Sequence, residues 1–189
     1  MTDLSKDDLR EQAAIHRTQL PPDITAPEEA ARLFAEHVSV QKGQIVAGYW
    51  PMGKEFDVRY ILDDLLKAGV TCALPIAGND GRVMRFVQWN DKTAMKKGGF
   101  GVMEPEGGEL VDPDILIVPF LAFDRHGYRL GRGGGHYDAT IADLRARKHI
   151  IAVGVGYAEQ AVLFNLPVED HDQKLDLIIT PQSVLDFRN

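Results

Sequence analysis

The stretch from Gly127 to Asp138, GYRLGRGGGHYD, concentrates residue types that bind anions, with five glycines and two arginines in twelve residues. Glycine lets an anion approach the backbone N–H groups closely, and arginine supplies paired donors. Because a helix is expected to begin near Asp138, these N–H groups would lie at the positive end of its dipole. The stretch therefore predicts a phosphate-binding loop. The alternative is a flexible surface loop, which would not need the large residues His136 and Tyr137.

Two common phosphate loops do not fit this stretch. A Walker A loop needs a lysine after its last glycine, whereas Gly135 is followed by His136. The dinucleotide fingerprint needs a third glycine where His136 stands, although Gly131 and Gly133 match its first two. The stretch also begins too far beyond the strand expected to end near Phe120. Only the general chemistry of a glycine-rich loop before a helix remains.

Asp138 suggests a metal ion in the same place. A carboxylate at a helix start is commonly a cap. Beside bound phosphates, however, Asp138 would be a like charge, and a bridging Mg²⁺ resolves this conflict because it prefers one or two carboxylates with phosphate oxygens and water. A second acidic cluster, EDHDQKLD at 169–176, offers another ligand, although such clusters are also typical of solvated turns.

A strand, helix and strand are predicted ahead of the glycine stretch. The helix covers 57–69, with Asp57 and Gly69 at its ends, and the strands cover 45–50 and 70–76. Five apolar residues of the helix share one face at helical spacing: Val58, Ile61, Leu62, Leu65 and Leu66. This order predicts a right-handed βαβ unit in a mostly parallel sheet.

The pattern recurs later in the chain. Strands are predicted at 82–89, 114–120, 150–157 and 177–180, and a helix at 138–148. The tripeptide Asn-Asp-Gly at 79–81 predicts a turn. Near the front, SKDD at 5–8 and TAPE at 25–28 both predict capping boxes at helix starts. We therefore expect one domain over 1–189, an α/β fold with a mostly parallel twisted sheet and helices on both faces, in a Rossmann-like three-layer arrangement.

Composition limits the function classes. The 189 residues are 44% apolar, enough for a single core, and carry a net charge of -7, which disfavours a nucleic-acid partner. Arg125, Arg129 and Arg132 lie in a segment without acids, which favours a small anionic ligand. Cys72 lies alone in an apolar run, and no apolar run is long enough for a membrane span. We expect a cytoplasmic monomer that acts on small molecules and not at membranes, with Cys72 as a buried structural thiol.

The segment PFLAFDRHGYRLGRGGGHYD at 119–138 resembles the signature of the 5-formyltetrahydrofolate cyclo-ligases, also called 5,10-methenyltetrahydrofolate synthetases. SKDDLR at 5–10 is similar to the Lys-x-x-x-Arg element of that family, and MGKEFD at 52–57 to its Met-x-x-Glu element. VEDHDQKLDLIIT at 168–180 is similar to its C-terminal signature. The resemblance spans nearly the whole chain, in the family's order.

The resemblance implies a role for each matching residue. It places eleven residues at ATP: Lys6, Arg10, Arg129, Leu130, Gly131, Arg132, Gly133, Gly134, Gly135, His136 and Tyr137. It places seven at the folate: Trp50, Glu55, Arg132, Gly133, Gly134, Gly135 and His136. Arg132 is implied to be catalytic. Asp138 and Asp172 are implied to be Mg²⁺ ligands, with Asp176 as a weaker candidate. The spacing of Lys6 and Arg10 independently puts both on one helix face.

Two residues depart from the family pattern. His136 stands where the family usually has Tyr or Phe, and Gly134 where many members have Lys or another side chain. The first changes the packing beside the substrate. Glycine at position 134 removes a cation from the phosphate loop. Arg129 and Arg132 are available to replace its positive charge.

The resemblance implies an ATP- and Mg²⁺-dependent enzyme that converts 5-formyltetrahydrofolate into 5,10-methenyltetrahydrofolate. In this chemistry the formyl oxygen is phosphorylated and N10 then closes the ring. The sequence contains no Gly-x-Ser-x-Gly or His-Glu-x-x-His motif, in keeping with a reaction that needs no protein nucleophile. One alternative is a nucleotide- or folate-binding regulatory module without catalysis. A nicotinamide-dependent oxidoreductase is disfavoured, because the strand at 150–157 ends in Tyr157 and not in an acid.

Overall fold

The structure is a computed structural model that describes residues 4–76 and 81–188. Asn79 and Asp80 of the predicted turn lie outside the described residues. Among the described residues, no helix is both long enough and apolar enough to cross a lipid bilayer.

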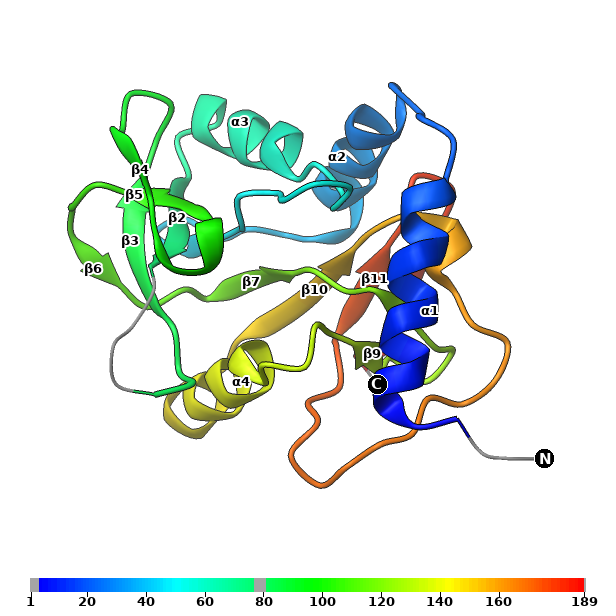
Figure 1. Cartoon of the computed structure of the whole chain (residues 1–189). Coiled ribbons are helices and arrows are strands. Elements are labelled where there is room, and N and C mark those ends of the chain that lie inside the picture. The colour runs from blue at the N-terminus through cyan, green and yellow to red at the C-terminus, as the bar shows by residue number, and fades with distance from the viewer. Residues whose placement is uncertain (1–3, 77–80, 189) are drawn as a thin grey trace.

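The centre of the molecule is a mixed sheet, in which eight strands of the described residues run in the order β12-β11-β10-β7-β1-β2-β3-β6 (Figure 1). Its inner strands pair in parallel: β1 (Ile45–Ala47), β2 (Thr71–Ile76), β7 (Ile115–Val118), β10 (Ile151–Val155) and β11 (Leu177–Ile179). The edges are antiparallel: β3 (Arg85–Trp89) and β6 (Leu110–Val111) on one side, and β12 (Val184–Asp186) on the other. The predicted mostly parallel sheet is confirmed.

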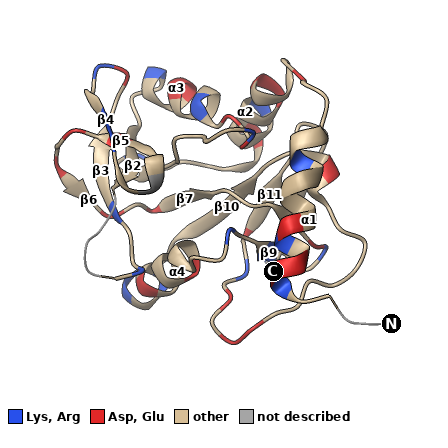
Figure 2. Ribbon diagram, viewed as in Figure 1, with Lys and Arg blue, Asp and Glu red and all other residues tan. Residues whose placement is uncertain are grey.

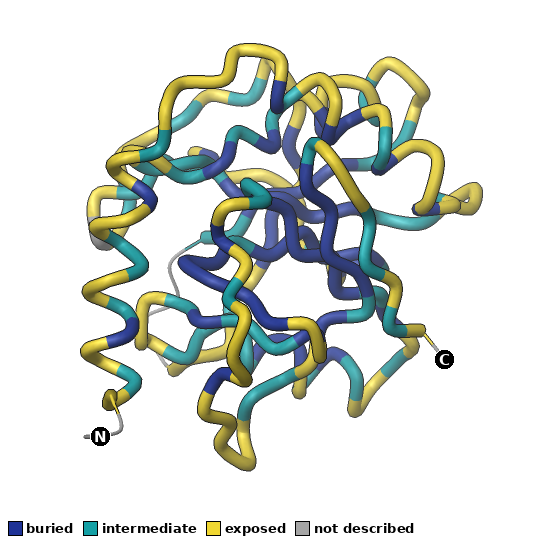
Figure 3. The backbone as a smooth tube through the Cα atoms, turned by 90° about the vertical axis from the view of Figure 1, so that its right-hand side faces the viewer, coloured by how far each residue is buried: buried dark blue, intermediate teal, exposed yellow. Residues whose placement is uncertain are grey.

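Helices cover both faces of this sheet, as predicted (Figure 1). α2 (Ala26–His37) and α3 (Arg59–Lys67) pack on one face, where Phe34, Ile61 and Leu62 join a fully buried core. α4 (His136–Arg147) packs on the other face through Ile141 and Leu144. The strands between them form the buried centre of the molecule in Figure 3. Burial of apolar area in these two cores is the main stabilising term, at roughly 25 cal/mol per Å².

α1 (Lys6–Gln19) lies at one end of the sheet rather than on a face, beside β9 (Figure 1). Its Leu9 packs in a small cluster with Ala122, Leu130 and Leu166. The predicted capping box is present, because the Ser5 hydroxyl accepts from the backbone N–H of Asp8 and the Asp8 carboxylate accepts from that of Ser5. The first turn of this helix is therefore well defined.

The second predicted capping box is wrong. α2 follows Thr25, but the Thr25 side chain makes no cap hydrogen bond. Asp23 takes this role, since one of its carboxylate oxygens accepts from the backbone N–H groups of Thr25 and Ala26 and from the Thr25 hydroxyl. This aspartate, two residues before Thr25, satisfies N–H groups just ahead of the helix through an Asx turn, and the motif TAPE does not reveal this.

Short hairpins were not predicted. β8 (Ala122–Phe123) and β9 (Arg129–Leu130) pair just before the glycine run, and β4 (Met95–Lys97) pairs with β5 (Met103–Pro105). Two 3₁₀ turns, Gly99–Gly101 and Ala158–Gln160, complete the described elements. The β8–β9 hairpin holds the glycine run close to α1.

Candidate active site

A cavity of about 500 Å³ lies at the carboxyl ends of the central parallel strands. Trp50 follows β1, Ile76 ends β2, and Phe120 follows β7, and all three line it. Ligands of open α/β sheets bind at this edge. Other walls come from α1, the residues after β9 and the loop at 171–172, and further lining residues come from the segments around Glu55, Met84 and Val102.

The glycine run forms one wall of the cavity. Gly133 and Gly135 have positive φ values of 100° and 69°, a conformation that side chains rarely adopt. Within the described part of the chain, none of the five backbone N–H groups of residues 131–135 donates a hydrogen bond. These N–H groups lie just before the first residue of α4, where the helix dipole favours an anion.

The helix after the glycine run begins earlier than predicted. α4 starts at His136, with Gly135 as its N-cap residue, so Asp138 lies in the first turn and does not cap the helix. One oxygen of Asp138 instead accepts from the backbone N–H of Gln173 at 2.9 Å and lies 3.1 Å from the Arg129 guanidinium. The cap interpretation of Asp138 is therefore wrong.

Arg129 and Asp138 tie the glycine run to the loop that carries Asp172. The Arg129 side chain is 4% exposed, and its Nη1 donates to the carbonyl oxygen of Gln173 at 3.0 Å. Since Asp138 binds the N–H of the same residue, both polar groups of the Gln173 backbone are held. Asp138 and Asp172 consequently lie at the same end of the cavity, which both of them line.

Lys6 reaches the same end of the cavity from α1. Its ammonium lies 2.6 Å from Asp172 and 2.9 Å from Glu169. Burial alone would lower the pKa of Lys6, but hydrogen bonds to the two carboxylates and their charge outweigh it and raise the pKa. Burial alone would raise the pKa of Asp172. Hydrogen bonds from the Lys6 ammonium and from the N–H of Glu169 outweigh burial and lower this pKa.

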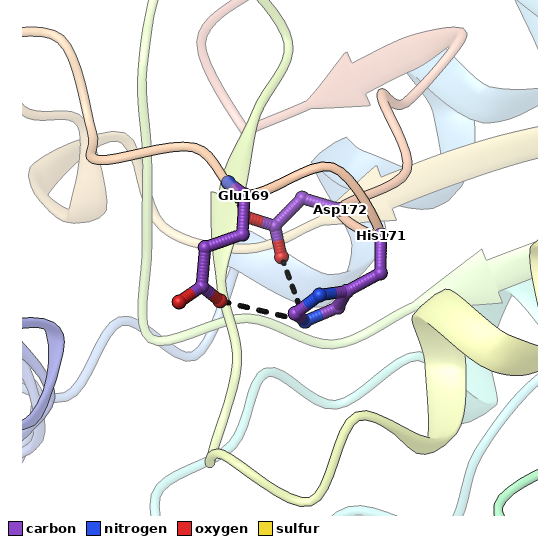
Figure 4. A group of neighbouring side chains, drawn as sticks. All are labelled: Glu169, His171 and Asp172. Carbon is purple, nitrogen blue, oxygen red and sulfur yellow. Dashed lines mark hydrogen bonds and ion pairs between the residues drawn. The ribbon is translucent and has the colours of Figure 1, made fainter.

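Glu169, His171 and Asp172 form a compact group of possible metal ligands (Figure 4). Their ligand atoms all lie within 4.8 Å of one another, and His171 Nε2 is 3.4 Å from the Glu169 carboxylate. Lys6 already neutralises much of the negative charge of this group. Asp176, the weaker candidate, does not line the cavity and instead pairs with Arg145 at 2.9 Å.

Basic residues lie on α1 and on the loop leading into α4, where these two elements approach each other (Figure 2). Arg10 Nε donates to the carbonyl oxygen of Gly131 at 3.3 Å. This contact joins the second predicted cation of α1 to the glycine run. Lys6 and Arg10 thus line one cavity, as their helical spacing predicts.

The other end of the cavity contains Trp50, Glu55 and Arg132. Glu55 has a side chain only 9% exposed, and its carboxylate lies 3.0 Å from Arg132 and accepts from the N–H of Met52 at 2.9 Å. Trp50 packs edge-on against Trp89, with ring centroids 6.2 Å apart. Arg132 therefore extends from the glycine run to the residues that the family resemblance places at the folate.

The two departures from the family pattern contact each other. A Cβ atom on Gly134 would lie 2.8 Å from Cδ2 of His136, too close for van der Waals contact. The His136 ring is held in place, since its Nδ1 lies 3.1 Å from the carbonyl oxygen of Arg82. A side chain at position 134 would therefore have to displace this histidine ring.

Leu130 and Tyr137 lie on either side of the glycine run. Leu130 is 3% exposed in the cluster that holds α1. Tyr137 packs against the core under α4, where burial raises the pKa of its phenol, with a further contribution from the charge of Glu55. Their side chains hold the loop in place, and both residues line the cavity.

Several residues of this cavity were missed, and Arg17 is one of them. Arg17 lines it from α1 and is 8% exposed. Lys6, Arg10 and Arg17 follow one another at intervals of four and seven residues, which places all three on one helix face. Extending the helical spacing beyond Arg10 would have identified it.

Comparison with known proteins gives consistent results. A family model described as the 5-formyltetrahydrofolate cyclo-ligase family matches residues 3–181. The 5-formyltetrahydrofolate cyclo-ligase of Mycolicibacterium smegmatis is 32% identical over 96% of this chain and 96% of that protein. The Escherichia coli protein of the same name is 30% identical over 85% of this chain and 90% of its own length.

Solved structures show the same likeness. The 5,10-methenyltetrahydrofolate synthetase of Aquifex aeolicus matches with a TM-score of 0.80 and 29% identity, over 98% of this chain and 94% of that one. A 5,10-methenyltetrahydrofolate synthetase from Mycoplasma pneumoniae matches with a TM-score of 0.74 over 94% of this chain and 99% of that one. At 19% identity, the second match supports the fold alone.

Proposed function

Because this chain belongs to the 5-formyltetrahydrofolate cyclo-ligase family, we propose that it uses ATP to convert 5-formyltetrahydrofolate into 5,10-methenyltetrahydrofolate. The observation that carries the proposal is one cavity with two chemically distinct ends. Unpaired backbone N–H groups and cations lie at one end, and a buried carboxylate with an aromatic side chain lies at the other. This arrangement suits a triphosphate beside a folate.

The ATP phosphates are placed on the glycine run. The N–H groups of residues 131–135 are oriented before any ligand arrives, so binding an anion requires little reorganisation. Lys6 and Arg10 add charge from α1, and Arg132 adds it from within the loop. Arg129 contributes its positive charge from a buried position while it holds Asp138.

Asp138 and Asp172 would hold the Mg²⁺ that accompanies ATP. In each carboxylate one oxygen is engaged, by Gln173 and Arg129 in the first and by Lys6 and Glu169 in the second. The second oxygen of each accepts no hydrogen bond within the described residues, so each is suited to coordinate the ion. Two carboxylate oxygens beside a phosphate loop fit the ligand preference of Mg²⁺. The bound ion would supply charge neutralisation at the transferring phosphoryl group.

The folate is placed at the other end, against Trp50 and Glu55. A buried carboxylate accepts hydrogen bonds from ring N–H groups, and an aromatic ring contacts the flat heterocycle. Residues 133–136 border both ligands because they lie between the two ends. The formyl group then faces the γ-phosphate beside Arg132.

The reaction proceeds by two displacements. The formyl oxygen attacks the γ-phosphorus, the bond to the β-phosphate oxygen breaks, and ADP leaves. N10 then attacks the activated formyl carbon and gives up its proton. The bond between that carbon and the oxygen breaks, and the oxygen departs with its phosphoryl group and this proton as inorganic phosphate, which leaves the methenyl cation. Residues 131–135 and Arg132 stabilise the charge on the transferred group, and the cavity aligns the reactants.

Several broader properties belong to the same proposal. One catalytic domain over 1–189 is part of the proposal, because residues from both ends of the chain line a single cavity, and so is a monomeric state. Cys72 is a buried free thiol, which supports a reducing compartment such as the cytoplasm. Light scattering during size-exclusion chromatography tests the oligomeric state.

The test is direct turnover by the purified protein. Incubation with 5-formyltetrahydrofolate and MgATP should produce the long-wavelength absorbance of the methenyl product, with one ADP and one phosphate for each ring closed. Omitting ATP, or replacing Mg²⁺ with a chelator, should abolish the signal. Tight binding of both ligands without product would instead support the regulatory binding module and overturn the enzyme.

A further inference from the structure

The Arg17 side chain lacks the partners that a buried cation normally has. It is 8% exposed, and its Nε is the one buried side-chain nitrogen or oxygen that has no hydrogen-bond partner within the described residues. Within the described residues its hydrogen bond is a long one, in which Nη1 donates to the carbonyl oxygen of Phe120 at 3.5 Å. No carboxylate of the described part of the chain lies within 4.0 Å of the guanidinium.

Such an arrangement costs stability in the ligand-free protein. Removing a charge from water is unfavourable unless paired groups replace the lost hydration. Burial lowers the pKa of Arg17, and the charge of Arg132 lowers it further, while Glu55 opposes the change. Since arginine stays charged in proteins, the protein keeps a desolvated cation with unused donors. Because Arg17 lines the cavity, a ligand there would supply the missing acceptor.

The position of Arg17 distinguishes between the two substrates. At about 1.5 Å per residue, Arg17 lies roughly 10 Å farther along α1 than Arg10, away from the end where Lys6 contacts Asp172. Its electrostatic neighbours are Glu55 and the phenol of Tyr49, which belong to the other end of the cavity. Phe120 and Leu121 add apolar walls. Arg17 therefore faces the folate and not the triphosphate.

We propose that Arg17 is a further substrate-binding residue, whose guanidinium donates to a carbonyl oxygen at the pterin end of the folate. The inference rests on the proposed function of the same cavity. The glutamate tail of a folate carries charges that are best left in water, so the enclosed end of the cavity takes the pterin. A pterin edge presents both N–H donors and a carbonyl acceptor, which a carboxylate and a guanidinium respectively complement. Glu55 and Arg17 supply this pair.

The test is ligand binding without turnover. Affinities for 5-formyltetrahydrofolate without ATP, and for MgATP without folate, are measured by calorimetry for the wild type and for Arg17→Met, which keeps the length and apolar volume. We expect folate binding to weaken by roughly tenfold to a hundredfold, because a charge-assisted hydrogen bond is lost, and MgATP binding to change by less than about twofold. Unchanged folate affinity, or weaker MgATP binding instead, would overturn the inference.

Thermal stability separates a ligand contact from a structural one. If Arg17 is held for a ligand, ligand-free Arg17→Met should melt at or above the wild-type temperature, because an unpaired buried charge has been removed. A lower melting temperature with unchanged folate affinity would make Arg17 a structural residue. Arg17→Lys keeps the charge but not the planar fork, and it should also bind folate more weakly, so it decides the question if the methionine variant does not fold. Arg32→Met, on exposed ion pairs of α2, is the matched control.

A truncated ligand identifies the end of the folate that Arg17 contacts. 5-Formyltetrahydropteroate lacks the glutamate, and Arg17→Met should weaken its binding by the same factor as for the full folate. An effect that disappears with the truncated ligand would assign Arg17 to the glutamate carboxylates and overturn the pterin contact. Failure of the wild type to bind or convert 5-formyltetrahydrofolate would refute the proposed function itself. If the wild type is active and Arg17→Met binds folate with unchanged affinity, only the role of Arg17 would be refuted.

Discussion

Arg132 and Asp138 are the residues on which the proposed chemistry depends most directly. Arg132 extends from the phosphate loop to Glu55, and Asp138 offers one carboxylate oxygen while the other is held by Gln173. We expect Arg132→Ala and Asp138→Asn each to lower kcat/KM at least tenfold with the fold intact, since removing one preorganised charge contact costs about 3 kcal/mol. Steady-state kinetics with circular dichroism measures both effects.

The controls for these variants come from the same elements. Arg125 lies on the hairpin that precedes Arg132 but does not line the cavity, so Arg125→Ala is the first control. Asp143 lies on α4 in an exposed ion pair with Arg147, so Asp143→Asn is the second. Both should retain activity. Asp138→Asn should in addition need more Mg²⁺ for half-maximal rate, whereas Arg132→Ala should not. Near-normal activity of Arg132→Ala and Asp138→Asn would contradict the assignment of Arg132 and Asp138 to the active site.

Gly134 and His136 should behave as a coupled pair. Gly134→Ala places a Cβ 2.8 Å from the His136 ring and must displace it. In a His136→Ala background the ring is absent, so the same change should have a much smaller effect on the KM for ATP and on the melting temperature. A double-mutant cycle measures this coupling. Additive effects would mean that the two family departures are unrelated.

Residue types, spacing and the family resemblance identified the glycine-rich and much of the charged part of the cavity lining, because a glycine-rich loop carries its chemistry in its own sequence. Apolar lining residues such as Met84, Val102 and Phe120 were not identified by these signals. They did not reveal which contacts each residue makes. Arg129 was expected at phosphate, yet its guanidinium holds Asp138 and the Gln173 backbone. Arg17 has no motif around it, because a single arginine seven residues beyond Arg10 is identified only when the helix face is followed to its end. Such contacts depend on tertiary packing.

Among the secondary-structure elements, α1 is expected to strengthen ATP binding through its first turn. Its first turn carries Lys6 and is held by the Ser5 capping box. Ser5→Ala should fray this turn, at about 1 kcal/mol, and raise the KM for ATP by roughly fivefold, with kcat nearly unchanged. Thr25→Ala is the matched control, because the Thr25 side chain does not cap α2. Equal effects of both substitutions on the KM would contradict this role of α1.

Longer elements were predictable and short ones were not. α3 and the inner strands carry apolar runs with helical or strand periodicity, and the structure confirms that these elements form. The predicted cap at Asp57 is wrong, because α3 begins at Arg59 with Val58 as its N-cap residue. β8 and β9 have two residues each, too few to show any period, and their pairing depends on the contacts that the hairpin makes with α1. The first turn of α4 was misplaced because a left-handed Gly135 starts the helix, where an aspartate cap was expected.

For the molecule as a whole, the reactivity of the Cys72 thiol measures whether the core is folded. It is fully buried on β2, and burial raises the pKa of its thiol to about 12 from the ordinary 9.0. The folded protein should therefore react very slowly with a disulfide reagent at pH 8, and urea should expose one thiol per chain. Fast labelling of the native protein would contradict the burial.

The raised pKa of Cys72 also predicts that the folded protein loses stability at alkaline pH. Because the folded pKa of Cys72 lies above the unfolded one, the stability it contributes is complete below about pH 9 and is lost as the pH rises toward about 12. Cys72→Ala should show less of this alkaline loss in urea denaturation at different pH values. An identical pH dependence would assign the loss to other groups.

The contact between Lys6 and Asp172 joins residues 166 positions apart. Ribosomes release the chain from its N-terminus, so α1 leaves the exit tunnel long before its partner loop exists. The end of the cavity that we propose for ATP therefore includes a contact that cannot form until Asp172 has been synthesised. Assembly of this end is thus a late event in the making of the chain.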